Sequence, residues 1–103
     1  MITAFQKKVY SLCKKVPKGK ITTYKEIGRT IGKKGQVYRA VGAALNKNPF
    51  APVVPCHRVV KSDGSVGGFA SGTRKKINLL RKEGIIIKNN KIVDFKKRFY
   101  RFK

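Results

Sequence analysis

Apolar residues in the first part of the chain recur every three or four positions, which is the period of a helix with one buried face. These apolar positions are Phe5, Val9, Leu12 and Val16. Thr3 and Gln6 stand at the spacing of a capping box, in which the two side chains satisfy free backbone N–H groups at a helix start. The pattern therefore predicts a helix from about Thr3 to Val16, ended by Pro17 and Gly19.

A second and a third helix are predicted next, separated by a glycine-containing break at residues 32–35. Thr23 and Glu26 repeat the capping-box spacing, so we interpret Glu26 as a helix-start residue rather than a catalytic one. Helical periodicity predicts the third helix from about Gln36 to Asn46. Its inward positions are Val37, Val41, Ala44 and Leu45, and its outward positions are Tyr38, Arg39, Gly42 and Ala43. Two short helices joined in this way are typical of a helix-turn-helix unit. The small outward residues would allow either a close approach to a groove or tight helix packing.

The middle of the chain contains segments that do not continue these helices. Residues 48–52 include two prolines and predict an irregular loop. Residues 53–60 are mostly apolar and predict a short extended segment. Residues 61–65 predict a turn that contains Asp63, and residues 67–72 predict a loop of small side chains.

The last part of the chain predicts one more helix and a hairpin. Thr73 is expected to cap a helix that runs to about Glu83 and ends at Gly84. Residues 85–95 then alternate around an Asn-Asn pair, which predicts a β-hairpin. The final residues, KKRFYRFK, interleave bases with aromatics. They could either pack on the core or follow a nucleic-acid backbone.

The charge balance of the chain is strongly one-sided. Of its 103 residues, 26 are Lys or Arg and four are Asp or Glu, giving a formal net charge of +22. Repulsion on this scale destabilises a compact domain unless a polyanion compensates it. Nucleic acid is the polyanion that fits such a surface best. The alternative is a solvated basic surface suited to high temperature or high salt.

The same composition bears on location and redox state. No apolar run is long enough to cross a bilayer, and the N-terminal segment MITAFQKKVY lacks the pattern of a signal peptide. We therefore expect a cytoplasmic, nucleoid-associated protein with no membrane partner, built as one domain over residues 1–103. Cys13 and Cys56 are too few for a disulfide framework. Cys13 lies beside the apolar stripe of the first helix, and we interpret it as a core residue.

The segment with the clearest chemical signal is Pro55-Cys56-His57-Arg58-Val59. A cysteine next to an imidazole in a positive domain is where a reactive thiolate is expected, and the alternative is a free buried thiol beside a surface histidine. Neighbouring residues of an extended segment point to opposite faces, so a bridging water is the expected link between Cys56 and His57. Glu83 is one of the four acids that could orient the imidazole. A zinc site is not expected, because two cysteines and one histidine leave a tetrahedral site short of ligands.

Several short segments, taken in order, resemble the O6-alkylguanine-DNA alkyltransferases, also called methylated-DNA–protein-cysteine methyltransferases. The segments are FQKKV (5–9), VPKG (16–19), TY (23–24), RAVG (39–42), NP (48–49), PCHRV (55–59) and LLRKEG (79–84). PCHRV is the family's signature, and the resemblance covers about residues 5–84, nearly the whole DNA-binding and active-site domain. It implies a mostly α fold with a small β element, that is, a winged-helix-like helix-turn-helix domain with short hairpins. Residues 85–103 form the basic hairpin and tail beyond it.

The resemblance also implies roles for individual residues. Cys56 would be the acceptor nucleophile, and His57 and Glu83 would deprotonate it through a water molecule. Tyr24 would help to rotate the nucleotide out of the helix and would protonate the leaving guanine. Arg39 would fill the gap left in the base stack.

Further residues match positions around the substrate. Asn48 would belong to a hinge that holds the helix-turn-helix against the active-site loop. The backbones of Val59 and Ala70 would contact the polar edge of the guanine, and Phe69 would form a wall of the pocket, where the family often has tyrosine. The small residues that would approach the minor groove are Ala40, Gly42 and Ala43.

The implied function is the repair of double-stranded DNA by irreversible, single-turnover transfer of an alkyl group from O6-alkylguanine to Cys56 after nucleotide flipping. The protein would act as a monomer without a cofactor or metal. Most family members carry an additional N-terminal domain, whereas the resemblance here begins at Phe5. One alternative is an alkyltransferase-like protein, which binds the lesion but lacks the cysteine, so Cys56 argues against it. The other is a basic helix-turn-helix DNA-binding protein.

Overall fold

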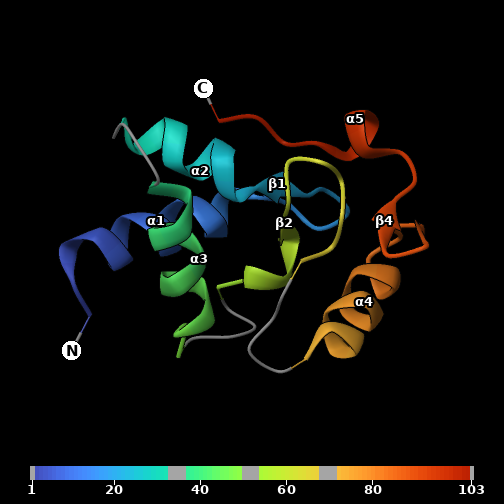
Figure 1. Cartoon of the computed structure of the whole chain (residues 1–103), viewed down its shortest axis with the longest axis horizontal. Helices are drawn as coiled ribbons and strands as arrows, with labels where there is room; N and C mark the ends of the chain where they lie inside the picture. The colour runs from blue at the N-terminus through green and yellow to red at the C-terminus, as the bar shows by residue number, and fades with distance from the viewer. Residues whose placement is uncertain (1, 33–36, 50–53, 68–71, 103) are drawn as a thin grey trace.

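The computed structural model of the chain describes residues 2–32, 37–49, 54–67 and 72–102. Over these residues the chain is mostly helical, with two small sheets of two strands each (Figure 1). The helices are α1 (Ala4–Lys15), α2 (Tyr24–Ile31), α3 (Val37–Asn46), α4 (Thr73–Lys82) and α5 (Phe95–Arg98), and Cys56–Arg58 form a 3₁₀ turn, η1. The strands are β1 (Thr22–Thr23), β2 (Val59–Val60), β3 (Ile87–Lys88) and β4 (Lys91–Ile92). The prediction of a mostly α domain with a small β element is confirmed.

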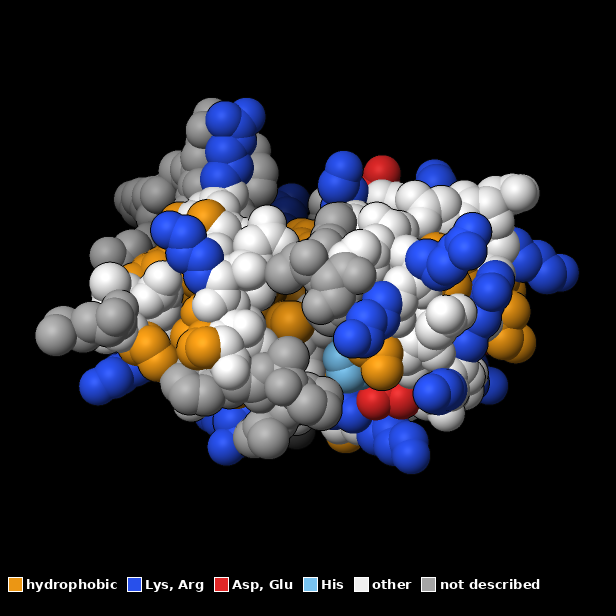
Figure 2. Space-filling view, turned by 90° about the horizontal axis from the view of Figure 1, so that it is seen from below, with side chains coloured by type: hydrophobic (Ala, Val, Ile, Leu, Met, Phe, Trp, Pro, Cys, Tyr) orange, Lys and Arg blue, Asp and Glu red, His pale blue; other side chains and the backbone are white. Residues whose placement is uncertain are grey.

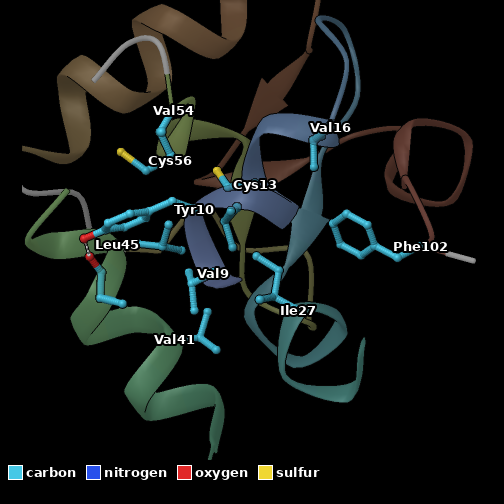
Figure 3. Close-up of a cluster of buried hydrophobic side chains, with 12 residues drawn as sticks. Val9, Tyr10, Cys13, Val16, Ile27, Val41, Leu45, Val54, Cys56 and Phe102 are labelled. Atoms are coloured by element: carbon cyan, nitrogen blue, oxygen red, sulfur yellow. Dashed lines mark hydrogen bonds between the residues drawn. The ribbon is translucent and has the colours of Figure 1, made fainter. Parts of the chain in front are cut away.

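Helix α1 begins at the predicted cap. The Thr3 hydroxyl accepts from the Gln6 N–H at 3.0 Å, and the Gln6 side chain accepts from the Thr3 N–H at 2.9 Å. The Tyr10 hydroxyl donates to the carbonyl of Ala44 at 2.7 Å and so ties α1 to α3 (Figure 3). Cys13 is fully buried, as expected of a core residue.

The hydrophobic core consists of two clusters of buried side chains. The larger one joins the first three helices to the Cys56 segment (Figure 3). Its members are Val9, Tyr10, Cys13, Val16, Ile27, Val41, Ala44, Leu45, Val54, Cys56, Val59 and Phe102. The smaller one contains Ile21, Val60, Val66, Leu80, Ile85, Ile87 and Ile92. Cys56 therefore belongs to the packed core, and burial restricts how its side chain can move.

Strands β1 and β2 pair in parallel, with Thr22 opposite Val59 and Thr23 opposite Val60. Tyr24 follows β1 directly, and η1 precedes β2 directly. The pairing therefore holds the start of α2 beside the segment that carries Cys56.

The prediction that residues 53–60 are extended is wrong for the middle of the segment. Residues 56–58 form η1, closed by a hydrogen bond from the Arg58 N–H to the Pro55 carbonyl at 2.9 Å. The proline ring restricts the backbone at Pro55, where φ is −82° and ψ is 69°, and the chain turns there instead of running straight. The argument that Cys56 and His57 face opposite ways on a strand therefore does not apply.

Helix α4 starts one position earlier than a Thr73 cap would require. Its N-cap is Gly72, and no side chain caps it. Gly72 has a φ of +98°, which glycine adopts without a steric penalty, so the chain turns into the helix before Thr73. Gly84, with a φ of +89°, follows the last turn as predicted.

The C-terminal hairpin forms as predicted. Asn89 and Asn90 have φ values of 50° and 64°, the left-handed conformation that a two-residue hairpin turn requires. In the tail, Tyr100 N–H donates to the carbonyl of Ile21 at 2.7 Å, and Phe102 is buried in the larger core cluster. The tail aromatics therefore pack on the core. None of the described helices combines the length and the apolar character needed to cross a membrane.

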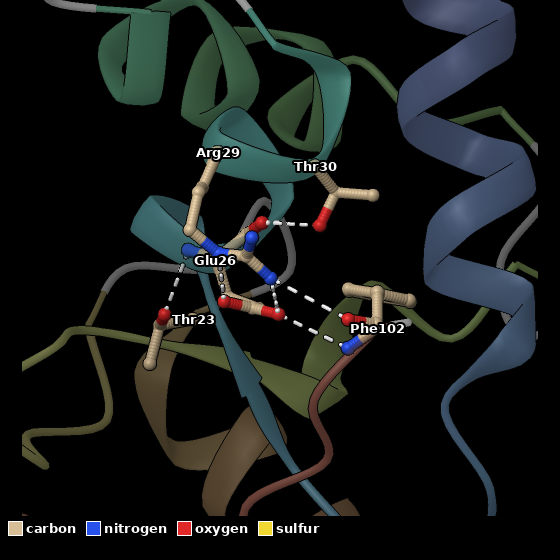
Figure 4. A network of polar contacts seen from close by, with 5 residues as sticks. All are labelled: Thr23, Glu26, Arg29, Thr30 and Phe102. Atoms are coloured by element: carbon tan, nitrogen blue, oxygen red, sulfur yellow. Dashed lines mark hydrogen bonds and ion pairs between the residues drawn. The ribbon is translucent and has the colours of Figure 1, made fainter.

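Glu26 forms only half of the predicted capping box. Its N–H donates to the Thr23 hydroxyl at 3.0 Å, but its carboxylate binds the guanidinium of Arg29 at 2.9 and 2.7 Å and the N–H of Phe102 at 3.0 Å (Figure 4). The hydrogen bond from Arg29 is the main reason that the pKa of Glu26 lies below its usual value. The carboxylate thus fastens the end of the tail to α2, which explains the burial of an acidic side chain.

Candidate active site

The turn η1 places Cys56 and His57 side by side in sequence with both side chains buried. Cys56 is 6% exposed and His57 is 4% exposed. Three backbone hydrogen bonds of about 3 Å hold the turn, from Cys56 to Val54, from Arg58 to Pro55 and from Val59 to Cys56. The candidate nucleophile and its neighbouring imidazole are therefore held by the fold before any ligand binds.

Glu83, at the end of α4, brings its carboxylate to this turn. Its Oε2 atom lies 3.1 Å from Nε2 of His57, close enough for a charge contact although the two groups are not aligned as a full hydrogen bond. Such contacts are often poorly aligned in ligand-free sites. The contact places the acid beside the imidazole, as the orienting role requires, and leaves Nδ1 as the nitrogen that can accept a proton.

Arg58 holds the same carboxylate from the other side. Its guanidinium donates to both Glu83 oxygens, at 2.9 and 2.6 Å, and to the Val16 carbonyl at 2.8 Å. Burial would raise the pKa of Glu83, but the hydrogen bonds from Arg58 and the contact with His57 outweigh burial and lower that pKa. The carboxylate is therefore ionised at neutral pH. The contact between Arg58 and Glu83, 25 positions apart, is not indicated by the local sequence pattern.

The electrostatics leave His57 able to act as a base. Burial is the largest influence and lowers the pKa of His57, the charge of Glu83 raises it, and the cations Arg58 and Lys76 lower it further. The net pKa lies below the usual 6.5. At pH 7 the imidazole is mostly neutral, which is the form that accepts a proton.

Lys76 is a further candidate site residue, which the sequence pattern did not single out. It is fully buried on α4 and donates to the carbonyl of Val59 at 2.6 Å and to the Tyr24 hydroxyl at 3.3 Å. Burial lowers the pKa of Lys76 to about 8. The signal that could have found it is its position four residues before the inward-facing Leu80, which puts a lysine on the buried face of the helix.

Tyr24, the first residue of α2, lies between Lys76 and two glycines. Burial and an ionised Cys56 raise the pKa of Tyr24 to about 12, so its hydroxyl keeps its proton. A Cβ added at Gly67 would lie 3.5 Å from the Tyr24 hydroxyl, and one added at Gly42 would lie 4.0 Å from the ring. A Cβ at Gly42 would make only an ordinary contact with the ring, so the distance shows that α3 lies next to Tyr24 at this position.

Helix α3 presents the residues assigned to DNA contact. Arg39 and Ala43 are exposed, and Val41, Ala44 and Leu45 are buried, as the helical pattern predicted. Ala40 is also exposed, whereas Gly42 is half-buried. Basic side chains are spread over the face seen from below, with few acidic ones among them (Figure 2). Figure 2 is therefore consistent with an electropositive surface.

The remaining residues assigned to the site are partly described. The Asn48 side chain donates to the carbonyl of Val54 at 2.9 Å, two residues before Cys56, and so links the end of α3 to the Cys56 segment. The Val59 carbonyl is bound by Lys76. Phe69 and Ala70 lie outside the described residues. The structure thus brings Cys56, His57, Glu83, Tyr24 and Val59 together, and keeps Arg39 on the exposed side of α3.

Comparison with known proteins decides the family. Residues 4–85 match the sequence profile of the 6-O-methylguanine DNA methyltransferase, DNA binding domain. The chain belongs to this family. A methylated-DNA–protein-cysteine methyltransferase of Methanosarcina barkeri is 51% identical over 81 residues, which are 79% of this chain and 51% of that protein. The chain spans about half the length of the curated relatives it matches.

Two solved structures that contain DNA share this fold. Mycobacterium tuberculosis OGT in complex with DNA is 40% identical with a TM-score of 0.76, and the match covers 81% of this chain and 51% of that one. S. pombe Atl1 in complex with damaged DNA containing O6-carboxymethylguanine is 28% identical with a TM-score of 0.83, and the match covers 95% of each chain. The second match therefore includes most of the hairpin and tail, beyond the segment that matches the profile.

The contact between Glu83 and His57 gives a first prediction for this domain. In Glu83→Gln the pKa of His57 should fall further, because the carboxylate charge that raises it is gone while burial remains. We expect alkyl transfer to slow by about a hundredfold as the imidazole loses its orienting partner. The acid limb of the pH–rate profile should move to lower pH. Single-turnover transfer rates between about pH 4 and pH 8 measure both effects.

Glu26→Gln is the matched control, since it removes a different buried carboxylate that binds Arg29 and the tail. Its acid limb should coincide with that of the wild type.

The stability of the wild type should fall as the pH drops through the lowered pKa of Glu83, and this loss should be smaller in Glu83→Gln. An acid limb that Glu83→Gln leaves in place would contradict the assignment.

Proposed function

We propose that this domain repairs DNA by taking the alkyl group from O6-alkylguanine onto Cys56, once per molecule. The observation that carries the proposal is the buried Cys56 beside a neutral His57, whose imidazole contacts an ionised Glu83. Family membership and the names of the relatives support the same chemistry. The structures of M. tuberculosis OGT and S. pombe Atl1 with DNA support duplex DNA as the partner.

The reaction begins with proton transfer from Cys56. The thiol gives its proton through a water molecule to His57, whose positive charge Glu83 then stabilises. The sulfur electron pair forms a bond to the alkyl carbon while the bond from that carbon to O6 breaks and its electrons remain on the guanine. The product is a thioether, which no base in the site readily reverses, so the protein is consumed.

Tyr24 and Lys76 act on the leaving group. The Tyr24 hydroxyl, whose pKa of about 12 keeps it protonated at neutral pH, donates to the guanine as negative charge develops on it. Lys76, hydrogen-bonded to that hydroxyl, can return a proton to Tyr24. An ammonium ion in this buried place also stabilises the Cys56 thiolate before attack.

Access to the alkyl carbon requires the nucleotide to leave the base stack. We propose that α3 approaches the minor groove with its small exposed residues and that Arg39 fills the vacated position. Tyr24 stands at the start of α2, next to Gly42 of α3. Helix α3, which approaches the groove, and Tyr24, which donates a proton to the guanine, are thus neighbours. We expect the domain to carry out flipping and transfer as a monomer without a cofactor.

A second candidate is an alkyltransferase-like lesion sensor. The observation in its favour is the match to S. pombe Atl1, which covers 95% of both chains. The two functions differ in whether sulfur forms a covalent bond. Cys56, with a base beside it, favours transfer.

The test is the intact mass of the protein after incubation with a duplex that contains O6-methylguanine. We expect a gain of one methylene in stoichiometric amount, mapped by peptide sequencing to Cys56, and no gain with unmodified duplex. An unchanged mass in a sample that binds the lesion would favour the sensor instead.

A further inference from the structure

The β3–β4 hairpin packs directly against the turn that follows the Cys56 segment. The Ile92 N–H donates to the carbonyl of Gly64 at 2.9 Å, and the Val66 N–H donates to the carbonyl of Asn90 at 3.0 Å. Ser65 and Lys91 form an antiparallel bridge between the two segments. Hairpin residues outside the segment that matches the family profile are therefore fixed to a loop of the candidate site.

The turn that pairs with the hairpin through Gly64 and Val66 also lies close to Tyr24, at Gly67. A Cβ added at Gly67 would lie 3.4 Å from Cγ of Lys61 and 3.5 Å from the Tyr24 hydroxyl. Lys61 is exposed, and both its side chain and the Tyr24 hydroxyl lie next to Gly67. The turn thus connects the hairpin to the site.

The hairpin carries like charges that its own structure does not neutralise. Lys88 and Lys91 are exposed and stand directly opposite each other in the ladder, an arrangement that destabilises a hairpin. Asp63 lies near Lys91 and Lys61, and its carboxylate accepts from the N–H and hydroxyl of Ser65 at 2.9 and 2.7 Å. The charges of Lys91 and Lys61 contribute to lowering the pKa of Asp63, after the Ser65 hydrogen bonds. Lys61, Lys88 and Lys91 together carry three positive charges, against the single negative charge of Asp63.

We propose that Lys61, Lys88 and Lys91 form a basic ridge that binds the phosphate backbone of the duplex beyond the lesion. The inference rests on the proposed function, because duplex DNA is the polyanion that would lie at Tyr24. The backbone that carries these lysines is held by hydrogen bonds and a two-residue turn. Little ordering of this backbone is therefore needed when the lysines displace the counterions of the DNA phosphates. The hairpin then lengthens the DNA contact that α3 begins.

The test uses Lys88→Gln/Lys91→Gln and a matched double variant, Lys14→Gln/Lys15→Gln, which removes the same charge from exposed positions at the end of α1. Binding to an unmodified 24-base-pair duplex is measured over a range of salt concentrations. We expect the slope of log affinity against log salt to fall by about 1.8 in the hairpin variant, the value for two lost phosphate contacts. The α1 variant should change it much less.

If the slope of log affinity against log salt is equal in the two variants, the hairpin lysines do not bind the duplex, and the proposal is overturned. Transfer from free O6-benzylguanine should be unchanged in both variants, because neither changes Cys56 or its partners. Transfer and duplex binding test the two proposals separately. A wild type that gains no alkyl group contradicts the proposed function, whereas the salt slopes decide whether the hairpin lysines bind phosphates. Thermal unfolding should show both variants folded, since the four lysines are exposed.

Discussion

In Cys56→Ala, incubation with a duplex that contains O6-methylguanine is expected to leave the mass of the protein unchanged. The sulfur that forms the thioether is absent, and no neighbouring side chain can replace it. Binding to the lesion should persist, because α3, Tyr24 and Arg39 are untouched. The loss of one buried atom should cost only about 1 kcal/mol of unfolding free energy. Intact-mass and gel-shift measurements on the same sample check both parts.

Cys13→Ala is the control for this experiment. Cys13 is also buried in the core cluster, but burial, together with an ionised Cys56, raises the pKa of its thiol to about 12. It therefore stays protonated at neutral pH and is not a nucleophile. We expect transfer in Cys13→Ala to match the wild type. A methyl group found on Cys13, or a mass gain in Cys56→Ala, would contradict the assignment of the acceptor.

Lys76→Met should separate activity from stability. Transfer is expected to fall about a hundredfold, as it does when a preorganised donor to developing charge is removed. The unfolding free energy at pH 7 should change by no more than about 2 kcal/mol. Removing a buried ammonium relieves its desolvation, whereas the Val59 carbonyl loses its donor, and these effects oppose each other.

The difference in unfolding free energy between the wild type and Lys76→Met should change with pH, because the fold lowers the pKa of Lys76. The pKa of Lys76 falls from 10.5 in the unfolded chain to about 8 in the fold, so the unfolded state binds more protons between these values. The wild type should therefore gain about 3 kcal/mol relative to Lys76→Met as the pH rises from 8 to 10.5. Urea unfolding at pH 7 and pH 10.5 measures the difference.

The exposed neighbour Lys75 provides the control. Lys75→Met removes the same charge from the same helix, and it should change neither the transfer rate nor the pH dependence of stability. A parallel pH dependence in Lys76→Met and the wild type would show that Lys76 is not the titrating group. An unchanged transfer rate in Lys76→Met would contradict its action on Tyr24.

Elements that depend on neighbouring residues could be predicted from the sequence. The capping box of α1 links Thr3 to Gln6, and the hairpin turn needs only the left-handed tolerance of Asn89 and Asn90. The inward face of α3 follows from its period, since its buried residues recur at helical spacing. In each case the deciding interaction spans four residues or fewer.

Among the predictions that failed, one did so because of a contact with a distant segment and one because the chain turns at a proline. Thr23 caps α2 as expected, but Glu26 does not return the bond, because Arg29 and the Phe102 N–H bind its carboxylate. The partner Phe102 lies 76 positions away, and nothing in the local pattern indicates it. The extended interpretation of residues 53–60 failed at Pro55, where the fold closes a turn instead.

The sequence by itself determined the family, the helical pattern and the identity of the candidate nucleophile, because short motifs and hydrophobic periods depend only on residues close together in the chain. Only the tertiary structure decided what surrounds that nucleophile. Arg58 meets a carboxylate 25 positions away, and Lys76 meets a hydroxyl 52 positions away. The physical reason is that burial and charge set proton affinities, and both depend on which distant segments the core packs together.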